Sequence, residues 1–499
     1  MIMNSKQMLK LPEADSLRKR ETAYIRSHTV TWEPPVDNQY YLEYSYNRSD
    51  WFALNGGNSI PLLQNGLELT PELQTQDPRG CELPLSVLET LKERYGAPEP
   101  VFLSEVEQVS LPDADAPLPL KVAVTYTNGM HEERPVIWDG LTGRIQEPVY
   151  AAPLISHRAD PYIYKHTDGK YYFIASHTDA GHNLDGRYQY LYLILRCADT
   201  LEDLTDNSGR YTEKIIYERK PVKGGTMSPH LWAPELHYIH GGWYVYYTAT
   251  ISDQSSWRIR PHCLACTGAD PMKDPWTEKG PVRTTVEGDI AFTDFSLDHT
   301  YFNHNGKDYF LWAQKTNNIS DIFIAGLADP WTICTPAVCL THPEYNWELH
   351  GFPVNEGPAV IRHGQKIFLT FSASGTDAMY CVGLLYADED ADLLDAASWT
   401  KCPHPVFQSS PVTGYYGPGH NSFTRSTDGS EDLIIYHGRQ EERYLGEGDY
   451  QPLYDAGRNA YVGKIFWGSD GMPSFSVPGA SIAARREDLI VRAEVDSGR

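Results

Sequence analysis

The sequence predicts an all-β protein in which a five-bladed β-propeller follows an N-terminal β-sandwich module. Five times between residues 150 and 440 a glycine-containing turn leads into an aromatic-rich strand, with turn glycines at Gly169, Gly242, Gly306, Gly364 and Gly429. Their spacings of 58 to 73 residues indicate propeller blades built from hairpins. Helical periodicity is scarce along the 499 residues, which supports the all-β class.

Residues 1–150 are the first of two predicted domains. Residues 84–95 have the leucine and valine spacing of a helix. From about residue 101 to residue 150 the pattern changes to alternating strands around the turn at Asn128 and Gly129. Such alternation between turn signals predicts the β-sandwich module.

Residues 151–485 are the predicted propeller domain. Its last blade needs a strand from another part of the chain, because an unpaired edge would invite pairing with other molecules. Segment 40–63 and segment 458–478 both have the strand pattern to supply it. A short helix is expected over residues 388–397.

One ionisable residue lies seven to nine positions before each turn glycine: Asp160, Glu235, Asp298, Glu356 and His420. Equivalent positions in successive blades face the same axis of a propeller. We therefore expect two Asp, two Glu and one His to meet in a central pit.

Such a pit can cleave a glycosidic bond. One carboxylic acid must protonate the leaving oxygen while a carboxylate activates water or attacks the sugar. Carboxylates on different blades suit the separation of about 6.5–9.5 Å used by inverting enzymes better than the shorter one of retaining enzymes. A third carboxylate nearby would raise the pKa of the acid by like-charge repulsion. The aromatic residues Trp232 and Phe295 are candidate platforms for the sugar.

The segments that carry these residues resemble the signature set of glycoside hydrolase family 43. In chain order they read RADPYIYKHTDGKYYF, LWAPELHYI, SLDHTYF, NEGPAVI and GPGHNSF. The resemblance covers roughly residues 151–480, and it implies a five-bladed propeller that hydrolyses arabinofuranosyl or xylosyl linkages with inversion. The tract TFSASGTDAMYCVGLL resembles members acting as α-L-arabinofuranosidases. Residues 118–140 resemble a bacterial immunoglobulin-like module.

The resemblance also implies roles for single residues. It makes Asp160 the general base, Glu356 the general acid, and Asp298 the residue that orients the acid and tunes its pKa. Glu235 is implied to support the site or contact substrate. Two further implied roles are those of Arg439, directed at sugar hydroxyls, and His420, which helps hold a hydrated cation near the axis. Calcium is the cation implied, and the reaction itself requires no cofactor.

Charge and hydropathy argue against nucleic acid and membranes as partners. The net charge of −24 would repel nucleic acid and anionic membranes. No apolar run approaches membrane-spanning length, and no secretory signal pattern is present, so we expect a cytoplasmic protein. The N-terminal module is expected to pack on the propeller or to form a homo-oligomer contact.

The leading hypothesis is an inverting, exo-acting hydrolase that releases terminal α-L-arabinofuranosyl residues from arabino-oligosaccharides. A β-xylosidase or galactofuranosidase would use the same carboxylates, so these activities stay open as alternatives. A hypothesis of a different class is a non-catalytic sugar-binding propeller, which would need no acid–base pair.

Overall fold

The structure is a computed structural model. It describes residues 22–28, 39–45, 48, 52–53, 60–61, 79–88, 103–126, 129–146, 150–177, 190–219, 231–252, 255, 257–409, 414–440, 452–453, 455–468, 470–475 and 490–495. The chain divides into two compact units, residues 150–463 and residues 1–149 together with 464–499.

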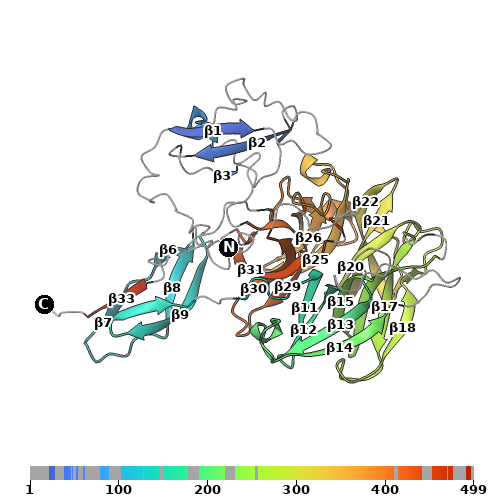
Figure 1. The fold of residues 1–499 in the computed structure, drawn as a ribbon, viewed down its shortest axis with the longest axis horizontal. Helices are drawn as coiled ribbons and strands as arrows, with labels where there is room; N and C mark the ends of the chain where they lie inside the picture. Colours follow the sequence, from blue (N-terminus) through green and yellow to red (C-terminus); the bar gives the residue numbers. More distant parts are fainter. Residues whose placement is uncertain are drawn as a thin grey trace, which may run out of the picture. The chain divides into compact units, whose positions relative to one another are not determined.

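Five sheets follow one another along residues 158–475 (Figure 1). In chain order their strands are β11 (Arg158–Lys165), β12 (Tyr171–His177), β13 (Tyr192–Ala198) and β14 (Thr212–Glu218); β15 (Trp232–Ile239), β16 (Gly242–Thr250), β17 (Ile259–Cys266) and β18 (Trp276–Pro281); β19 (Arg283–Thr284), β20 (Ser296–His304), β21 (Lys307–Thr316), β22 (Ile319–Asp329), β23 (Thr332–Ile333) and β24 (Val338–Thr341); β25 (Asn355–His363), β26 (Lys366–Ala373), β27 (Cys381–Asp388) and β28 (Thr400–Lys401); and β29 (Tyr416–Arg425), β30 (Asp432–Arg439), β31 (Asn459–Trp467) and β32 (Pro473–Phe475).

One edge strand of each sheet contacts the edge strand of the next sheet. Contacts join β11 to β15, β15 to β20, β20 to β25, β25 to β29, and β29 back to β11. These five strands therefore form a closed inner ring. The predicted all-β, β-propeller class is confirmed.

The turn glycines act as the sequence predicts. Gly169, Gly306, Gly364 and Gly429 have φ angles of 89°, 74°, 58° and 74°. Glycine has no Cβ atom and adopts this left-handed region at no steric cost, so each can close the hairpin between the first two strands of its sheet. In the second sheet the left-handed residue is Gly241, with φ 86°.

Aromatic and aliphatic side chains fill the space between the sheets. Strand β12 is buried at six of its seven positions, as expected for a sheet covered on both faces. One continuous core joins residues of the first four sheets, among them Trp243, Leu311, Leu369 and Trp399. Dense packing of this kind fixes the inner strands that carry the predicted site.

The other unit contains two sheets. The first consists of β1 (Thr22–His28), β2 (Gln39–Ser45), β3 (Phe52–Ala53), β4 (Ile60–Pro61) and β5 (Cys81–Pro84). The second has the order β6 (Leu103–Val106), β8 (Lys121–Tyr126), β9 (His131–Asp139), β10 (Thr142–Ile145), β33 (Ile490–Val495) and β7 (Val109–Leu111). Strand β33, which no sequence pattern predicts, pairs with β10 and with β7. An immunoglobulin-like topology for this unit stays a prediction.

Two expectations about single segments are resolved. Segment 458–478 supplies strands β31 and β32 of the last propeller sheet, whereas the described strands of segment 40–63, namely β2, β3 and β4, belong to the sheet of β1. The helix expected over residues 388–397 is wrong, because only the 3₁₀ turn η3 (Ala396–Ser398) forms there. The Asp392 and Asp395 side chains accept hydrogen bonds from the backbone N–H groups of Leu394 and Ala397, and such local bonds compete with an α-helix.

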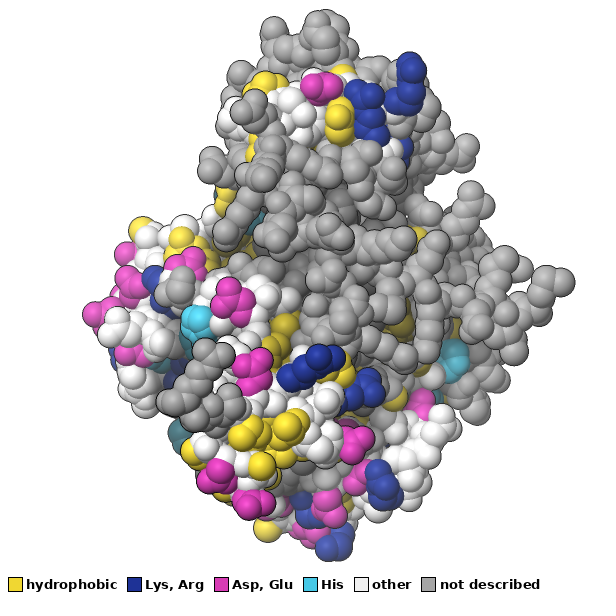
Figure 2. All heavy atoms as spheres, turned by 90° about the vertical axis from the view of Figure 1, so that its left-hand side faces the viewer, with side chains coloured by type: hydrophobic (Ala, Val, Ile, Leu, Met, Phe, Trp, Pro, Cys, Tyr) yellow, Lys and Arg dark blue, Asp and Glu magenta, His cyan; other side chains and the backbone are white. Residues whose placement is uncertain are grey.

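The remaining described helical segments are short. They are η1 (Glu202–Leu204), η2 (Asn346–Glu348) and residues 85–88. Of the helix expected over residues 84–95, Pro84 instead belongs to β5 and residues 89–95 lie outside the described residues. No helix in the described part of the chain has the length and apolar composition that a membrane crossing requires. Figure 2 shows acidic and basic side chains interspersed over the visible face rather than gathered in one patch.

Candidate active site

All five ionisable residues predicted to meet at the axis lie on strands of the inner ring. These are Asp160 on β11, Glu235 on β15, Asp298 on β20, Glu356 on β25 and His420 on β29. Four of them are buried, and Glu356 keeps partial access to solvent. The ring therefore gathers the titratable groups and leaves one carboxyl group within reach of a ligand.

A backbone irregularity marks the predicted residue on every ring strand. The pairing register of each strand with its neighbour shifts at this point. Each irregular segment also contains a residue with positive φ: Asp160 (51°), Ala233 (47°), Asp298 (42°), Gly357 (56°) and His420 (41°). A bulge redirects a side chain, and a strained non-glycine residue costs about 1–3 kcal/mol and persists mainly at functional sites. The five bulges thus give a local reason why these side chains leave the regular alternation.

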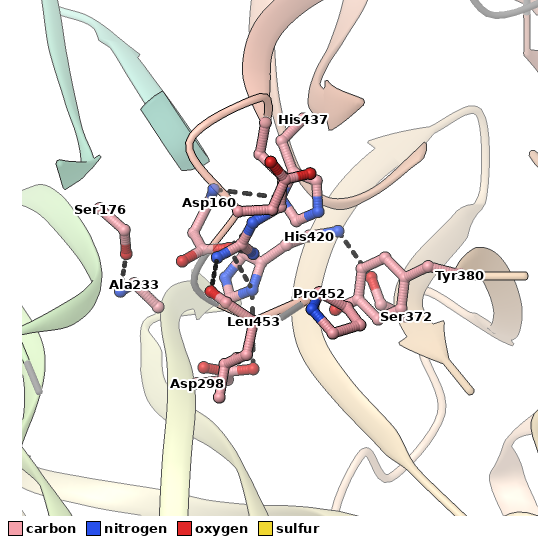
Figure 3. Close-up of polar contacts among 12 residues, drawn as sticks. Asp160, Ser176, Ala233, Asp298, Ser372, Tyr380, His420, His437, Pro452 and Leu453 are labelled. Atoms are coloured by element: carbon pink, nitrogen blue, oxygen red, sulfur yellow. Dashed lines mark hydrogen bonds and ion pairs between the residues drawn. The ribbon is translucent and has the colours of Figure 1, made fainter. Parts of the chain in front are cut away.

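Asp160 lies among basic side chains (Figure 3). Its Oδ1 atom is 3.5 Å from His420 Nδ1, 3.3 Å from His437 Nδ1 and 3.6 Å from an Nη atom of Arg458. The backbone N–H of Asp160 also donates to His437 Nδ1 over 3.2 Å. The base predicted from sequence is therefore held in place by two imidazoles and one guanidinium.

These neighbours keep Asp160 ionised. Burial alone would raise the pKa of Asp160, but His420, the hydrogen bond with His437, and Arg458 together hold it well below its usual range. Burial lowers the pKa of His420, and lowers that of His437 to about 3. Because both imidazoles are neutral near pH 7, Arg458 is the fixed positive charge that stabilises the carboxylate.

Glu356 has a different environment. Its Oε1 atom accepts a hydrogen bond of 2.8 Å from the Tyr380 hydroxyl. Burial and the negative charge of Asp160 raise the pKa of Glu356 to about 7, although Tyr380, Lys315 and Arg458 act in the opposite direction. A carboxyl group that keeps its proton near neutral pH can act as a general acid.

Asp298 interacts electrostatically with both Asp160 and Glu356. Its Oδ2 atom is 3.6 Å from His420 Nδ1. Burial and the charges of Glu356 and Asp160 raise the pKa of Asp298 well above its usual range, against a hydrogen bond from the Gly357 backbone. Asp298 and Glu356 therefore titrate as a pair. This pair keeps a proton at pH values at which an ordinary carboxyl group has lost it.

Glu235 is paired with a histidine. Its Oε2 atom lies 2.8 Å from His237 Nε2. Burial raises the pKa of Glu235 well above its usual range and lowers the pKa of His237 to about 3. The two side chains thus form a neutral hydrogen-bonded pair, an arrangement that suits support of the site better than proton transfer.

The two aromatic residues predicted to contact the sugar differ in burial. The Trp232 ring is buried, with its centroid 5.9 Å from that of Tyr190. The partly buried Phe295 ring stacks on Trp257, with centroids 6.3 Å apart. The roles of both as sugar platforms stay predictions.

Arg439 is buried and ion-paired. Its Nε atom bonds to Asp455 Oδ2 at 2.5 Å, and one of its Nη atoms donates to the Pro452 carbonyl. Its other Nη atom is buried and makes no hydrogen bond among the described residues. That single donor is what Arg439 could direct at a sugar hydroxyl, a role that stays a prediction.

Sequence reasoning missed Tyr380, His437 and Arg458. None of them lies on an inner-ring strand: Tyr380 precedes β27, His437 is on β30, and Arg458 precedes β31. The repeat that identified the five ring residues therefore carries no information about them. The only signal was indirect, since His437 lies two residues before Arg439 and Tyr380 lies in the tract that resembles arabinofuranosidases.

A calcium site was also expected at the axis. Within the described residues, no group of three or more His, Cys, Asp or Glu side chains could hold a metal ion. The described residues therefore do not form a direct metal centre, and His420 Nδ1 instead lies 3.5 and 3.6 Å from the carboxylates of Asp160 and Asp298. The cation held through water by His420 stays a prediction, and no step of the reaction is assigned to it.

Comparison with known proteins supports the sequence resemblance. The chain is 44% identical over 332 residues to the "Extracellular exo-alpha-(1->5)-L-arabinofuranosidase" of Streptomyces avermitilis, covering 66% of this chain and 63% of that protein. It is also 44% identical over 333 residues to "Alpha-L-arabinofuranosidase 43" of Humicola insolens, again covering 63% of the relative. The chain thus spans less than two thirds of the length of these two curated relatives.

A solved structure agrees in fold. The α-L-arabinofuranosidase from Lactobacillus brevis is 43% identical and superimposes with a TM-score of 0.58, covering 66% of this chain and 97% of that one. The family described as "Glycosyl hydrolases family 43" matches residues 150–473, which include every residue of the pit. The chain therefore belongs to glycosyl hydrolase family 43.

Proposed function

We propose that this chain is an exo-acting glycoside hydrolase that releases terminal α-L-arabinofuranosyl residues from arabino-oligosaccharides with inversion. The observation that carries the proposal is the opposite proton state of two carboxyl groups in one pit. Asp160 is ionised beside Arg458, while burial raises the pKa of Glu356 to about 7. The names of the relatives support arabinofuranose as the sugar.

The reaction assigns one role to each carboxyl group. Asp160 accepts a proton from a water molecule, whose oxygen forms a bond to the anomeric carbon. The bond from that carbon to the leaving oxygen breaks, and Glu356 donates its proton to the leaving oxygen. Because water enters on the face opposite the leaving group, the product has the inverted anomeric configuration. Asp298 orients Glu356 and, whenever it is ionised, supports the protonated state of Glu356 by like-charge repulsion.

Hydrolysis of α-1,5-arabinotriose, followed by proton NMR in the first minutes, tests this proposal. We expect free arabinose and arabinobiose, with the β-anomer of arabinose appearing first. Release of the α-anomer first would contradict inversion. Absence of cleavage would contradict the arabinofuranosidase activity, and parallel incubations with xylobiose and a galactofuranoside would test the alternative sugars.

Glu356→Gln separates an enzyme from a sugar-binding propeller. The amide has nearly the same shape but no proton to donate, so we expect turnover of arabinotriose to fall by about 10²- to 10⁴-fold. Binding of arabinose, measured by calorimetry, should persist in this variant. If the unmodified protein binds arabinose but cleaves none of the three sugars, the non-catalytic function is the correct one.

Location, assembly and calcium are separate proposals. We keep a cytoplasmic location as the proposal from sequence, although two relatives are named as extracellular; fractionation of the source cells would decide. Light scattering of the full chain would test a homo-oligomer formed through the N-terminal module. Elemental analysis of the purified protein would test the calcium ion.

A further inference from the structure

Tyr380 connects the two sides of the pit. Its hydroxyl donates to Glu356 Oε1 over 2.8 Å, and its ring stacks on the imidazole of His437 with centroids 5.5 Å apart and planes 2° from parallel. His437 in turn contacts both the backbone N–H and the carboxylate of Asp160. One buried side chain thus contacts the predicted acid and a residue that holds the predicted base.

The absence of a side chain at Gly419 leaves space for the ring of Tyr380. A Cβ atom on Gly419 would lie 2.3 Å from the ring of Tyr380, closer than any real contact. Gly419 precedes His420 on β29, so the ring strand that carries His420 is shaped to accept Tyr380. The ring is fully buried, and Figure 3 shows it beside Ser372.

A chain of hydrogen bonds fixes the direction in which Tyr380 donates. The backbone N–H of His420 donates to Ser372 Oγ over 2.7 Å. Ser372 lowers the pKa of Tyr380, as a hydroxyl placed to donate to it would, and Tyr380 donates to Glu356 Oε1. Since Ser372 Oγ already accepts a bond from His420, its own proton is free to point at the Tyr380 oxygen, which leaves the Tyr380 proton for Glu356.

We propose that Tyr380 is a positioning residue that decides which oxygen of Glu356 carries the acidic proton. Because Oε1 accepts the hydrogen bond from Tyr380, the proton of the neutral carboxyl group resides on Oε2, the oxygen left to face the departing sugar. This inference rests on the function proposed above, in which Glu356 is the general acid. It assigns to Tyr380 a role in leaving-group protonation that is separate from folding.

Other groups also act on Glu356, and the test must distinguish Tyr380 from them. The charged and titratable residues that act on Glu356 or on Tyr380 itself are Asp160, Asp298, Lys315, His437 and Arg458. All of them are retained in Tyr380→Phe, which removes one hydroxyl and keeps the ring. Tyr171→Phe is the matched control: Tyr171 is fully buried on β12, outside the pit, and its hydroxyl donates to the Arg425 carbonyl over 2.8 Å.

The experiment compares two leaving groups. Arabinobiose has an alcohol leaving group that needs protonation, whereas 2,4-dinitrophenyl α-L-arabinofuranoside has one that leaves with little help from an acid. For Tyr380→Phe we expect kcat/KM on arabinobiose to fall about 10- to 100-fold, and the value on the dinitrophenyl substrate to fall much less. The alkaline limb of the pH profile should move upward by about one unit, because the lost hydrogen bond stabilised the ionised form of Glu356.

The outcomes distinguish a failure of the role proposed for Tyr380 from a failure of the proposed function. Equal losses on both substrates with an unmoved alkaline limb would overturn the role of Tyr380, and so would unchanged kinetics. Failure of the unmodified protein to cleave either substrate would instead contradict the proposed function. Thermal unfolding of Tyr380→Phe and Tyr171→Phe measures the stability lost with a buried hydroxyl, and Tyr171→Phe should keep the unmodified kinetics on both substrates.

Discussion

The base side and the acid side of the pit are built from the same parts and reach opposite proton states. Asp160 and Glu356 both lie on inner-ring strands, at a bulge, deep in the same unit. Burial alone raises the pKa of each. The pKa of Asp160 nevertheless falls well below its usual range, while that of Glu356 rises to about 7.

The difference lies in the neighbours. Asp160 has the guanidinium of Arg458 at 3.6 Å, a charge that no accessible pH removes. Glu356 has a neutral hydroxyl from Tyr380 and the negative charge of Asp160, and the positive charges of Lys315 and Arg458 offset only part of the rise in its pKa. The two imidazoles and the guanidinium around Asp160 outweigh its burial, whereas burial outweighs the positive charges that act on Glu356.

Replacing Asp160, the predicted base, should cause the largest loss of activity. Asp160→Asn keeps the shape of the side chain, and asparagine tolerates the φ of 51° at this position. Without a carboxylate to accept the proton of water, we expect kcat on arabinotriose to fall by about 10²- to 10⁴-fold. Steady-state kinetics measures the loss, and calorimetry with arabinose shows that the pit still binds sugar. A raised KM with unchanged kcat would show that Asp160 only binds substrate.

Removal of the charge that holds the base should have a smaller and different effect. Arg458→Gln takes the fixed cation away from Asp160, so the pKa of Asp160 should rise from below its usual range. The acid limb of kcat/KM against pH should then move to higher pH by at least about one unit. The fall in rate near neutral pH should be smaller than that of Asp160→Asn.

Arg196→Gln is the matched control for this variant. Arg196 is also buried and ion-paired, with Asp206 and Glu213, but it lies on β13 outside the pit. It should lose comparable stability and leave both pH limbs in place. If the acid limb of Arg458→Gln stays where it is in the unmodified protein, His420 and His437 hold the pKa of Asp160 instead of Arg458.

The sequence predicted the carboxyl groups of the pit but not the residues that surround them. Glu356, Asp160 and Asp298 could be found because each occupies the same place in a repeat, seven to nine residues before a turn glycine. Tyr380, His437 and Arg458 could not, because they lie after the turn glycines or in connections between strands, outside the segment that repeats. The carboxylates were therefore predictable, whereas the groups that set their proton states required the three-dimensional arrangement.

For the fold, too, only features with a local sequence signal could be predicted. The turn glycines and aromatic strands predicted the sheets, since their signals are local. The pairing of β33 with β10 joins residues about 350 positions apart in the sequence, and no local pattern specifies such a partner. The helix expected over residues 388–397 failed for the opposite reason, because short-range bonds from Asp392 and Asp395 outweighed the helical spacing.

Asp298→Asn is the smallest and sharpest test of the acid side. Asparagine again suits the positive φ of 42°. If the negative charge of Asp298 keeps the proton on Glu356, its removal lowers the pKa of Glu356 below about 7, and the alkaline limb of kcat/KM moves to lower pH. We expect this downward shift, opposite in sign to the shift predicted for Tyr380→Phe. A limb that does not move would place the shared proton on Asp298 itself, because a neutral Asp298 exerts no repulsion that the substitution could remove. In that case Asp298 would act on Glu356 by orientation alone.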